Sequence, residues 1–312
     1  MRVLVTGGAG FIGSHLSDAF AARGDQVVVV DNLVAGRAER LDDRATLHKV
    51  SITDAGPLTA TVKHVRPELI CHLAAQIDVR HSVDAPAEDA QVNVVGTVNL
   101  LEAARKVDAR VLFASSGGAL YGRNAPIPSG EGVPPLPESP YGIAKYCAEQ
   151  YIELFNRLHR TRHTILRLAN VYGPRQDPSG DAGVIPIFCG CALMGEDPTI
   201  YGDGTQTRDY VYIGDVVKAF LAAADVNRAG TWNVGTGVET SVLDLVRIIA
   251  GVAAHPVQPN FGPPRAGELP RSVLAVSQAA EDLGWKAETR LADGIGKVYR
   301  WIEAGAPDRA AW

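Results

Sequence analysis

A tyrosine and a lysine stand four positions apart in the segment Tyr141-Gly142-Ile143-Ala144-Lys145. On a helix this spacing places both side chains on one face. A free phenol has a pKa of about 10, and a neighbouring ammonium group lowers that pKa because its positive charge favours the phenolate. Such a pair could take the proton of a hydroxyl group while the adjacent carbon loses a hydride. The spacing fits an exposed tyrosine and lysine as well, so the surrounding elements must decide.

Two serines, Ser115 and Ser116, follow the apolar run 110–114 and precede a pair of glycines. The run predicts a buried strand, so both hydroxyl groups should lie at a sheet edge. Ser116 could hold a substrate hydroxyl there, although serines after strands are also ordinary turn formers.

Three glycines, Gly7, Gly10 and Gly13, stand between an apolar run at 3–5 and a helical pattern over 11–22. Glycines at this spacing let the backbone turn tightly and approach a pyrophosphate, which would sit on the N-terminus of the helix. The order of strand, glycine loop and helix predicts a dinucleotide site.

An acidic residue, Asp31, ends a second apolar run that begins at Gln26. A carboxylate at this point pairs with the ribose hydroxyls of a dinucleotide and favours NAD over NADP. Arg37 lies close enough in sequence to meet a 2′-phosphate, so the preference is strong without being decisive.

The composition excludes several classes of protein. The 312 residues carry a net charge of −5, and no basic run offers a nucleic-acid or membrane footprint. The start at Val3 leads directly into the glycine loop without a signal-peptide layout, and no apolar stretch is long enough to span a bilayer. We expect a cytoplasmic protein. Cys189-Gly190-Cys191 lacks further ligands nearby, so we expect core cysteines and no metal.

Strand and helix patterns alternate through the first half of the chain. Strands are predicted at 45–50, 69–73, 110–114 and 163–168, where the last should close the sheet, and helices at 57–65, 86–106 and 140–160. This alternation predicts an α/β fold with a Rossmann-type doubly wound parallel sheet. We expect a dinucleotide-binding domain over 1–170. Residues 171–312 should form mainly a smaller substrate domain, with some segments returning to the first.

Together these residues resemble the extended short-chain dehydrogenase/reductases, and within them the UDP-glucose 4-epimerases. The resemblance covers nearly the whole chain and rests on an ordered set of motifs: the glycine triplet, Asp31, His72-Leu73-Ala74-Ala75, Asn93, Ser115-Ser116 with Tyr121-Gly122, Tyr141 to Lys145, Asn170-Val171-Tyr172-Gly173-Pro174-Arg175, Arg208-Asp209-Tyr210-Val211, and Pro264-Arg265-Ala266-Gly267-Glu268.

The resemblance implies tightly bound NAD and reversible epimerisation at C4 of a UDP-hexose through a transient 4-keto sugar. Tyr141, Lys145 and Ser116 would be catalytic. The positions that correspond to cofactor contacts are Gly7, Gly10, Phe11, Ile12, Gly13, Asp31, Asn32, Ser51, Ile52, Leu73, Ala74, Ala75, Gln76, Asn93, Ser115, Tyr141 and Lys145. Those that correspond to substrate contacts are Ser116, Gly117, Asn170, Val184, Tyr201, Arg208, Tyr210, Arg265 and Ser272.

Three positions depart from the family pattern. Gly117 stands where the family has a hydroxyl residue, so Ser116 or a water must take that role. Ser51 replaces an aspartate that often contacts the adenine. Ser272 occupies a gate position at which a bulky residue is thought to exclude N-acetylated sugars, so the resemblance allows UDP-N-acetylglucosamine as a substrate.

Several alternatives remain. A 4,6-dehydratase or a glucuronate decarboxylase would need acidic residues where the chain has Gly117-Gly118. A UDP-glucuronate 4-epimerase would need a cationic pocket, for which Arg80, His81 or Arg175 could serve. A non-catalytic redox sensor often loses the tyrosine or the lysine, and this chain keeps both.

The family forms dimers by pairing two long helices. The predicted helices 86–106 and 140–160 correspond to them, and we expect a homodimer with Tyr146, Ile152, Phe155 and Leu158 as apolar contacts.

Overall fold

The computed structural model describes residues 1–176, 183–265 and 268–305. Within them the largest sheet has seven strands, all parallel, and its order is β11 (Gly230–Val234), β6 (Thr164–Leu168), β5 (Arg110–Ser116), β4 (Leu69–His72), β1 (Arg2–Thr6), β2 (Gln26–Asp31) and β3 (Thr46–Lys49). This confirms the predicted doubly wound α/β fold.

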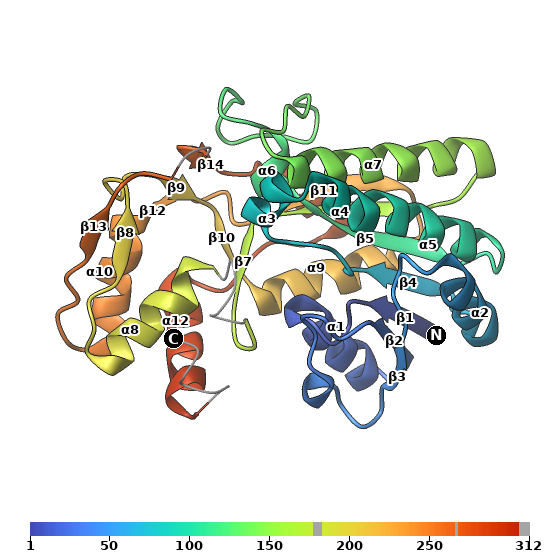
Figure 1. Cartoon of the computed structure of the whole chain (residues 1–312), viewed down its shortest axis with the longest axis horizontal. Coiled ribbons are helices and arrows are strands. Elements are labelled where there is room, and N and C mark those ends of the chain that lie inside the picture. The colour runs from blue at the N-terminus through green and yellow to red at the C-terminus, as the bar shows by residue number, and fades with distance from the viewer. Residues whose placement is uncertain (177–182, 266–267, 306–312) are drawn as a thin grey trace.

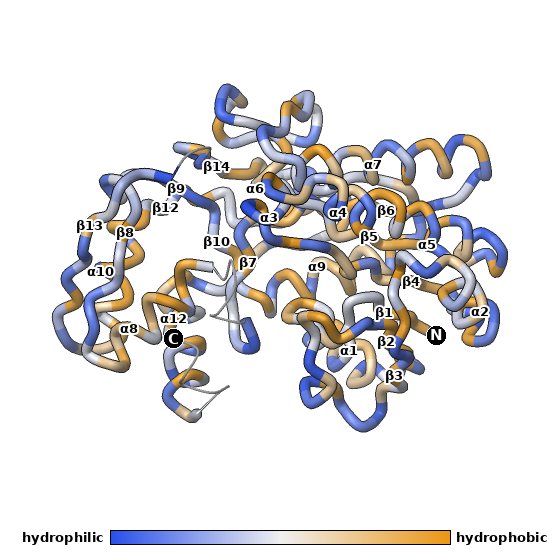
Figure 2. Tube along the Cα trace, in the orientation of Figure 1, coloured by the Kyte–Doolittle hydropathy of each residue, from blue (hydrophilic) through white to orange (hydrophobic). Residues whose placement is uncertain are grey.

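Helices cover both faces of this sheet, as Figure 1 shows. One face packs against α1 (Phe11–Ala22), α9 (Ile213–Asp225) and α11 (Ser277–Leu283). The other packs against α2 (Ala55–Val65), α5 (Gly96–Arg105) and α7 (Pro140–His159). Because the central strands are buried on both sides, their sequences are continuously apolar, and Figure 2 shows hydrophobic segments along β4, β5 and β6 with polar loops at the rim.

The sheet does not end at β6, so that prediction was wrong. β11 pairs with β6 in parallel, with Trp232 opposite Leu166. The strand lies more than sixty residues further along the chain, so its pairing depends on a long-range contact that local sequence does not encode.

The predicted helix over 86–106 is interrupted in its middle. It runs as α4 (Pro86–Ala90), a π-helical turn η2 (Gln91–Val95) and α5. The Thr97 hydroxyl donates to the carbonyl oxygen of Asn93 at 2.7 Å and gives this carbonyl a partner in the wider turn. Such turns are frequent at functional sites.

The remaining elements form a second hydrophobic core and several small sheets. The core holds α8 (Val184–Met194), α10 (Val242–Ala253) and α12 (Leu291–Glu303). Strand β7 (Asn170–Tyr172) pairs with β10 (Tyr210–Tyr212), and β8 (Thr199–Tyr201) with β13 (Asn260–Gly262). Strand β9 (Thr207–Arg208) lies between β12 (Thr240–Ser241) and β14 (Arg271–Ser272). Short helices α3 (Val79–Asp84), α6 (Gly117–Leu120) and η1 (Ala38–Arg40) complete the described chain.

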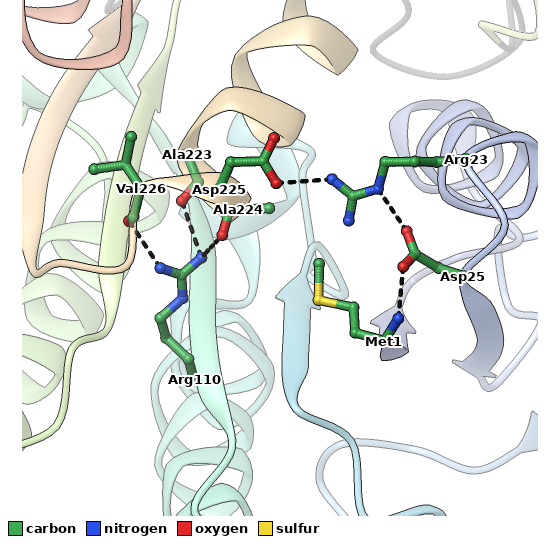
Figure 3. Close-up of polar contacts among 8 residues, drawn as sticks. All are labelled: Met1, Arg23, Asp25, Arg110, Ala223, Ala224, Asp225 and Val226. Carbon is green, nitrogen blue, oxygen red and sulfur yellow. Dashed lines mark hydrogen bonds and ion pairs between the residues drawn. The ribbon is translucent and has the colours of Figure 1, made fainter.

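A polar seam joins helices and strands at the amino ends of the central strands (Figure 3). Arg110, at the start of β5, donates to the carbonyl oxygens of Ala223, Ala224 and Val226 at the end of α9. Arg23 pairs with Asp25 and Asp225. These hydrogen bonds satisfy carbonyl oxygens that have no partner within the helix at its C-terminus. The opposite edge of the sheet, at the carboxyl ends of the strands, is where ligands of such folds bind.

None of the described helices is long and apolar enough to cross a membrane.

Candidate active site

The glycine loop after β1 adopts a shape that side chains would block. Gly7 has φ of +68°, and a Cβ there would lie 2.6 Å from the amide nitrogen of Ala74. A Cβ on Gly13 would lie 2.1 Å from the carbonyl oxygen of Gly7. Gly10 precedes α1, whose first residues are Phe11 and Ile12. The amide groups of a first helical turn lack intrahelical acceptors, so this loop offers a cradle for a pyrophosphate.

Asp31 ends β2 beside this loop and is 7 % exposed. Its carboxylate accepts from the amide nitrogens of Ala9 at 3.0 Å and Leu33 at 2.8 Å. The backbone amide of Arg37 donates to the carbonyl oxygen of Ala9, so Arg37 stands near the same loop. Asn32, the next residue, is exposed. The predicted acid therefore lies where the glycine loop and β2 meet.

The loop after β4 forms the adjoining wall. Leu73 and Ala74 donate their backbone amides to the carbonyl and hydroxyl oxygens of Thr6. Ala75 and Gln76 follow, and the side chain of Asn93 holds the backbone of Gln76 on both its amide and carbonyl groups. Ser51 and Ile52 follow the end of β3, which is the edge strand beyond β2, and the Ser51 hydroxyl is 2.8 Å from that of Thr53.

Tyr141 and Lys145 lie at the start of α7, beneath the carboxyl end of β5. Ser139 caps this helix by accepting from the amide nitrogen of Gly142 at 3.1 Å. The Lys145 ammonium group donates to the carbonyl oxygen of Ala114 at 3.1 Å, and its nitrogen is 5.9 Å from the centre of the Tyr141 ring. Ser116, the last residue of β5, lines the same cavity as Tyr141.

Burial controls the pKa values of this pair. Burial raises the pKa of Tyr141 to about 12, while the hydrogen bond from Ser116 opposes the rise and the charge of Asp89 adds to it. Burial also lowers the pKa of Lys145 to about 8, against the charges of Asp89 and Glu149. The expectation that Lys145 lowers the pKa of Tyr141 was therefore wrong for this structure, because desolvation dominates and the ammonium group bonds to Ala114.

A buried polar network, which no sequence motif predicts, lies directly behind Tyr141 and Lys145. Glu149 accepts from the Ser115 hydroxyl and pairs with Arg167 at 2.7 Å, with both charged side chains almost fully buried. Arg167 also donates to the Tyr121 hydroxyl, which donates to Asn233 on β11. The network ties α7, β5, β6 and β11 together beneath the site.

A cavity opens above Tyr141 at the carboxyl edge of the sheet. Its lining includes four of the predicted residues, Ser116, Tyr141, Asn170 and Arg208. Eight others were not predicted: Val79, Gly118, Ala119, Glu138, Ser139, Ala169, Glu268 and Leu269. Glu138 and Ser139 immediately precede Pro140 and Tyr141, and that proximity in sequence is the signal that could have found them.

The other predicted substrate residues lie outside that lining. Gly117 is covered by Leu274, since a Cβ on it would lie 2.6 Å from the leucine side chain. The guanidinium group of Arg265 stacks over the Tyr201 ring at 4.0 Å. Further predicted positions are Val184 at the start of α8, Tyr210 buried on β10 and Ser272 on β14, while Ala266 and Gly267 of the motif lie outside the described residues.

Within the described residues, no group of three or more histidine, cysteine or acidic side chains could hold a metal ion. Cys189 is buried in the core around α8, where burial raises its pKa to about 12.

Comparisons with known proteins agree with this geometry. The family model described as "NAD dependent epimerase/dehydratase family" matches residues 3–235. A UDP-glucose 4-epimerase from Mycolicibacterium smegmatis is 48% identical over 309 residues, which is 97% of this chain and 98% of the relative.

Two solved structures are also similar. The UDP-glucose 4-epimerase of Thermotoga maritima, determined with UDP-glucose, superposes with a TM-score of 0.96 at 43% identity and covers 97% of this chain and 99% of its own. The Thermus thermophilus UDP-glucose 4-epimerase in complex with NAD has a TM-score of 0.92 at 38% identity, over 98% of this chain and 100% of its own.

Proposed function

This chain belongs to the NAD dependent epimerase/dehydratase family, and we propose that it interconverts UDP-glucose and UDP-galactose by NAD-dependent epimerisation at C4. One observation carries the proposal beyond resemblance: Ser116 and Tyr141 meet in a cavity that also contains Asn170 and Arg208. A proton-transferring pair and groups suited to a nucleotide diphosphate therefore share one space.

The residues of the glycine loop and its neighbours fit NAD. The loop has no room for side chains at Gly7 and Gly13, and the N-terminus of α1 suits the pyrophosphate. Asp31 would accept hydrogen bonds from the ribose hydroxyls of NAD. Its negative charge would repel the 2′-phosphate of NADP. When bound, NAD supplies a reversible hydride acceptor and a positive charge that favours the phenolate of Tyr141.

In the proposed mechanism Tyr141 removes the proton of the sugar 4-hydroxyl and later returns a proton to the 4-keto oxygen. Ser116 lines the same cavity, and a hydrogen bond from its hydroxyl to the Tyr141 oxygen would oppose the effect of burial on that pKa. Its position supports its role in place of the hydroxyl residue that the family has at Gly117. Lys145 would hold the ribose hydroxyls and keep the site positively charged.

Arg208 would bind the substrate diphosphate together with Arg265, because guanidinium groups match phosphate oxygens in charge and geometry. In the structure Arg208 pairs with Glu268 at 3.3 Å, and both line the cavity. Substrate phosphate would have to replace this carboxylate. Asn170, at the cavity edge, would bond to the sugar or its nearest phosphate.

The cavity disfavours a sugar carboxylate. Glu138 lines it and is held ionised by Arg123, whose hydrogen bond to Glu138 lowers the pKa of this carboxyl group. Of the cations considered for a UDP-glucuronate 4-epimerase, His81 pairs with Glu88 and Arg175 with Asp18. UDP-N-acetylglucosamine stays a second candidate, since the small Ser272 stands at the gate position.

We also propose a cytoplasmic homodimer in which residues 171–312 mainly bind substrate. The four cysteines are free. Apolar side chains exposed along α7 support pairing of this helix with a second copy: Ile143, Tyr151, Leu154 and Leu158. Ile152 and Phe155 were wrongly expected to make such contacts, because both are buried against their own sheet. The mass in solution tests this proposal.

Incubation of the purified protein with UDP-galactose and no added nicotinamide tests the function. We expect UDP-glucose to appear until equilibrium, as followed by NMR of the anomeric protons. An unchanged spectrum from protein that contains bound NAD would reject this activity. UDP-glucuronate and UDP-N-acetylglucosamine would be examined in parallel reactions, and turnover of UDP-glucuronate at a similar rate would contradict the assigned role of Glu138.

A further inference from the structure

A buried carboxylate lies close to the Tyr141 and Lys145 pair, and no motif pointed to it. The Asp89 side chain on α4 is 1 % exposed. Its Oδ1 accepts from Gln76 Nε2 and from Asn93 Nδ2, both at 2.9 Å. Its Oδ2 is buried and has no hydrogen-bond partner within the described residues. A half-satisfied buried carboxylate is costly, so its presence needs a reason.

One consequence of this arrangement concerns the loop after β4. The Asn93 side chain accepts from the backbone amide of Gln76 at 3.0 Å and donates to its carbonyl oxygen at 2.9 Å. A carboxylate can only accept, so Asp89 forces the amide nitrogen of Asn93 toward itself and leaves the amide oxygen for the Gln76 amide. Asp89 therefore fixes the orientation in which Asn93 holds the loop.

The π-helical turn places these groups. Asn93 lies within η2, and Asp89 is the residue four positions before it. The Thr97 hydroxyl donates to the Asn93 carbonyl and is 3.0 Å from His72 Nε2, while His72 Nδ1 is 2.7 Å from the Thr6 hydroxyl. Asn93 is thus held through its backbone and side chain against the ends of β1 and β4, which carry the cofactor loops.

A second consequence concerns charge. The Lys145 ammonium group is buried, and the negative charges that act on it are those of Asp89 and Glu149. Glu149 already pairs with Arg167, which offsets much of its charge. Two other titratable groups face Lys145 and Asp89. They are His72, which burial keeps neutral, and Tyr141. On the far side, His81 faces Asp89 but pairs with the exposed Glu88.

We propose that Asp89 is a positioning residue of the active site: it orients Asn93 and the Gln76 loop toward the cofactor and supplies the buried negative charge that retains the Lys145 ammonium ion. Nothing in this assignment gives Asp89 a bond to the substrate. The proposal rests on the proposed function, since it assigns Asp89 to the same proton-transferring site.

Asp89→Asn and Asp89→Ala separate the two roles. Asparagine keeps an acceptor for Gln76 and Asn93 and removes the charge, so we expect it to retain NAD. Its basic limb of kcat/KM should move to lower pH by about one unit, because Lys145 loses a nearby opposite charge. Alanine also removes the acceptor, and we expect its dissociation constant for NAD to rise about tenfold or more. Glu88→Gln is the matched control and should change neither quantity.

Two results would overturn the proposal. One is an Asp89→Asn enzyme whose basic limb coincides with that of the wild type. The other is an Asp89→Ala protein that binds NAD as the wild type does, as measured by the NAD retained per chain after gel filtration. Should Asp89→Ala fail to fold, Asn93→Ser carries the same test of the loop. Absence of wild-type turnover would reject the proposed function instead, and NAD retention would still decide the role of Asp89.

Discussion

At the amino ends of the central strands, Arg110 and Arg23 are at least partly exposed and meet carbonyl oxygens and carboxylates, whereas at the carboxyl ends Lys145 and Asp89 are almost fully buried. The first edge satisfies its charges locally and gains modest stability. The second holds charges whose partners are incomplete, and burial lowers the pKa of Lys145 to about 8 and raises that of Asp89. Such an edge is costly to maintain, and this cost is typical of a site built for proton transfer.

The largest effect expected at the carboxyl edge follows from Tyr141→Phe. Loss of the phenolic oxygen removes the group that transfers the proton, so kcat should fall by about 10²–10⁴-fold or more. Steady-state rates with UDP-galactose measure the change, and NAD content and thermal unfolding should stay as in the wild type. If the variant kept a rate within tenfold of the wild type, a group other than Tyr141 would have to transfer the proton.

Breaking the buried ion pair behind the site should damage stability more than any single change at the amino edge. Arg167→Met leaves Glu149 charged and unpaired, which should cost about 3–5 kcal/mol of unfolding free energy. Urea unfolding measures this cost. The double variant Glu149→Gln/Arg167→Met should recover part of it, and a double variant as unstable as the single one would show that packing, not charge, sets the loss.

Histidines at the two edges should both make the fold sensitive to acid. Burial lowers the pKa of His163 to about 4 and that of His72 to about 3, from about 6.5 when exposed. The unfolded chain therefore binds protons first as pH falls, so stability is complete above about pH 6.5 and declines below it, by up to about 1.4 kcal/mol per pH unit for each histidine.

His163 offers the cleaner test, because its Nδ1 accepts from the Val111 amide at 3.1 Å near the amino edge. His163→Gln should reduce the slope of unfolding free energy against pH between about pH 6.5 and 4.5. An unchanged slope would mean that other groups cause the acid sensitivity.

The smallest effects should come from the polar seam at the amino edge. Arg23→Met should cost no more than about 1 kcal/mol, and its effect should shrink in high salt. Arg110→Met should cost about 1–3 kcal/mol, because it uncovers the carbonyl oxygens at the end of α9. Urea unfolding at low and high salt measures both. A larger loss of unfolding free energy for Arg23→Met than for Arg110→Met would contradict the view that the covered carbonyl oxygens matter more than the surface ion pairs.

Local patterns in the sequence predicted the parts of the site that are defined by residues close together in the chain. The glycine loop, Asp31 and the Tyr141-Lys145 pair all lie at the carboxyl edge of the sheet, because the carboxyl ends of parallel strands meet there. Features that depend on distant contacts were not predicted. In the sequence Asp89 is one more charge near the start of a helix. Its contact with Asn93 follows from helical spacing, but its contact with Gln76 depends on the packing of the loop after β4. The rise in the pKa of Tyr141 depends on burial, which residue spacing does not reveal.

The position of β11 at one edge of the sheet has a consequence for the order in which the molecule can be made. During synthesis β6 emerges more than sixty residues before the strand that pairs with its outer side. Until then its backbone groups stay open to other chains, and the sheet face that α9 will cover is exposed. A chain released after residue 170 would lack Phe220, Trp232 and Trp285 from its core, so it should aggregate instead of folding as half an enzyme.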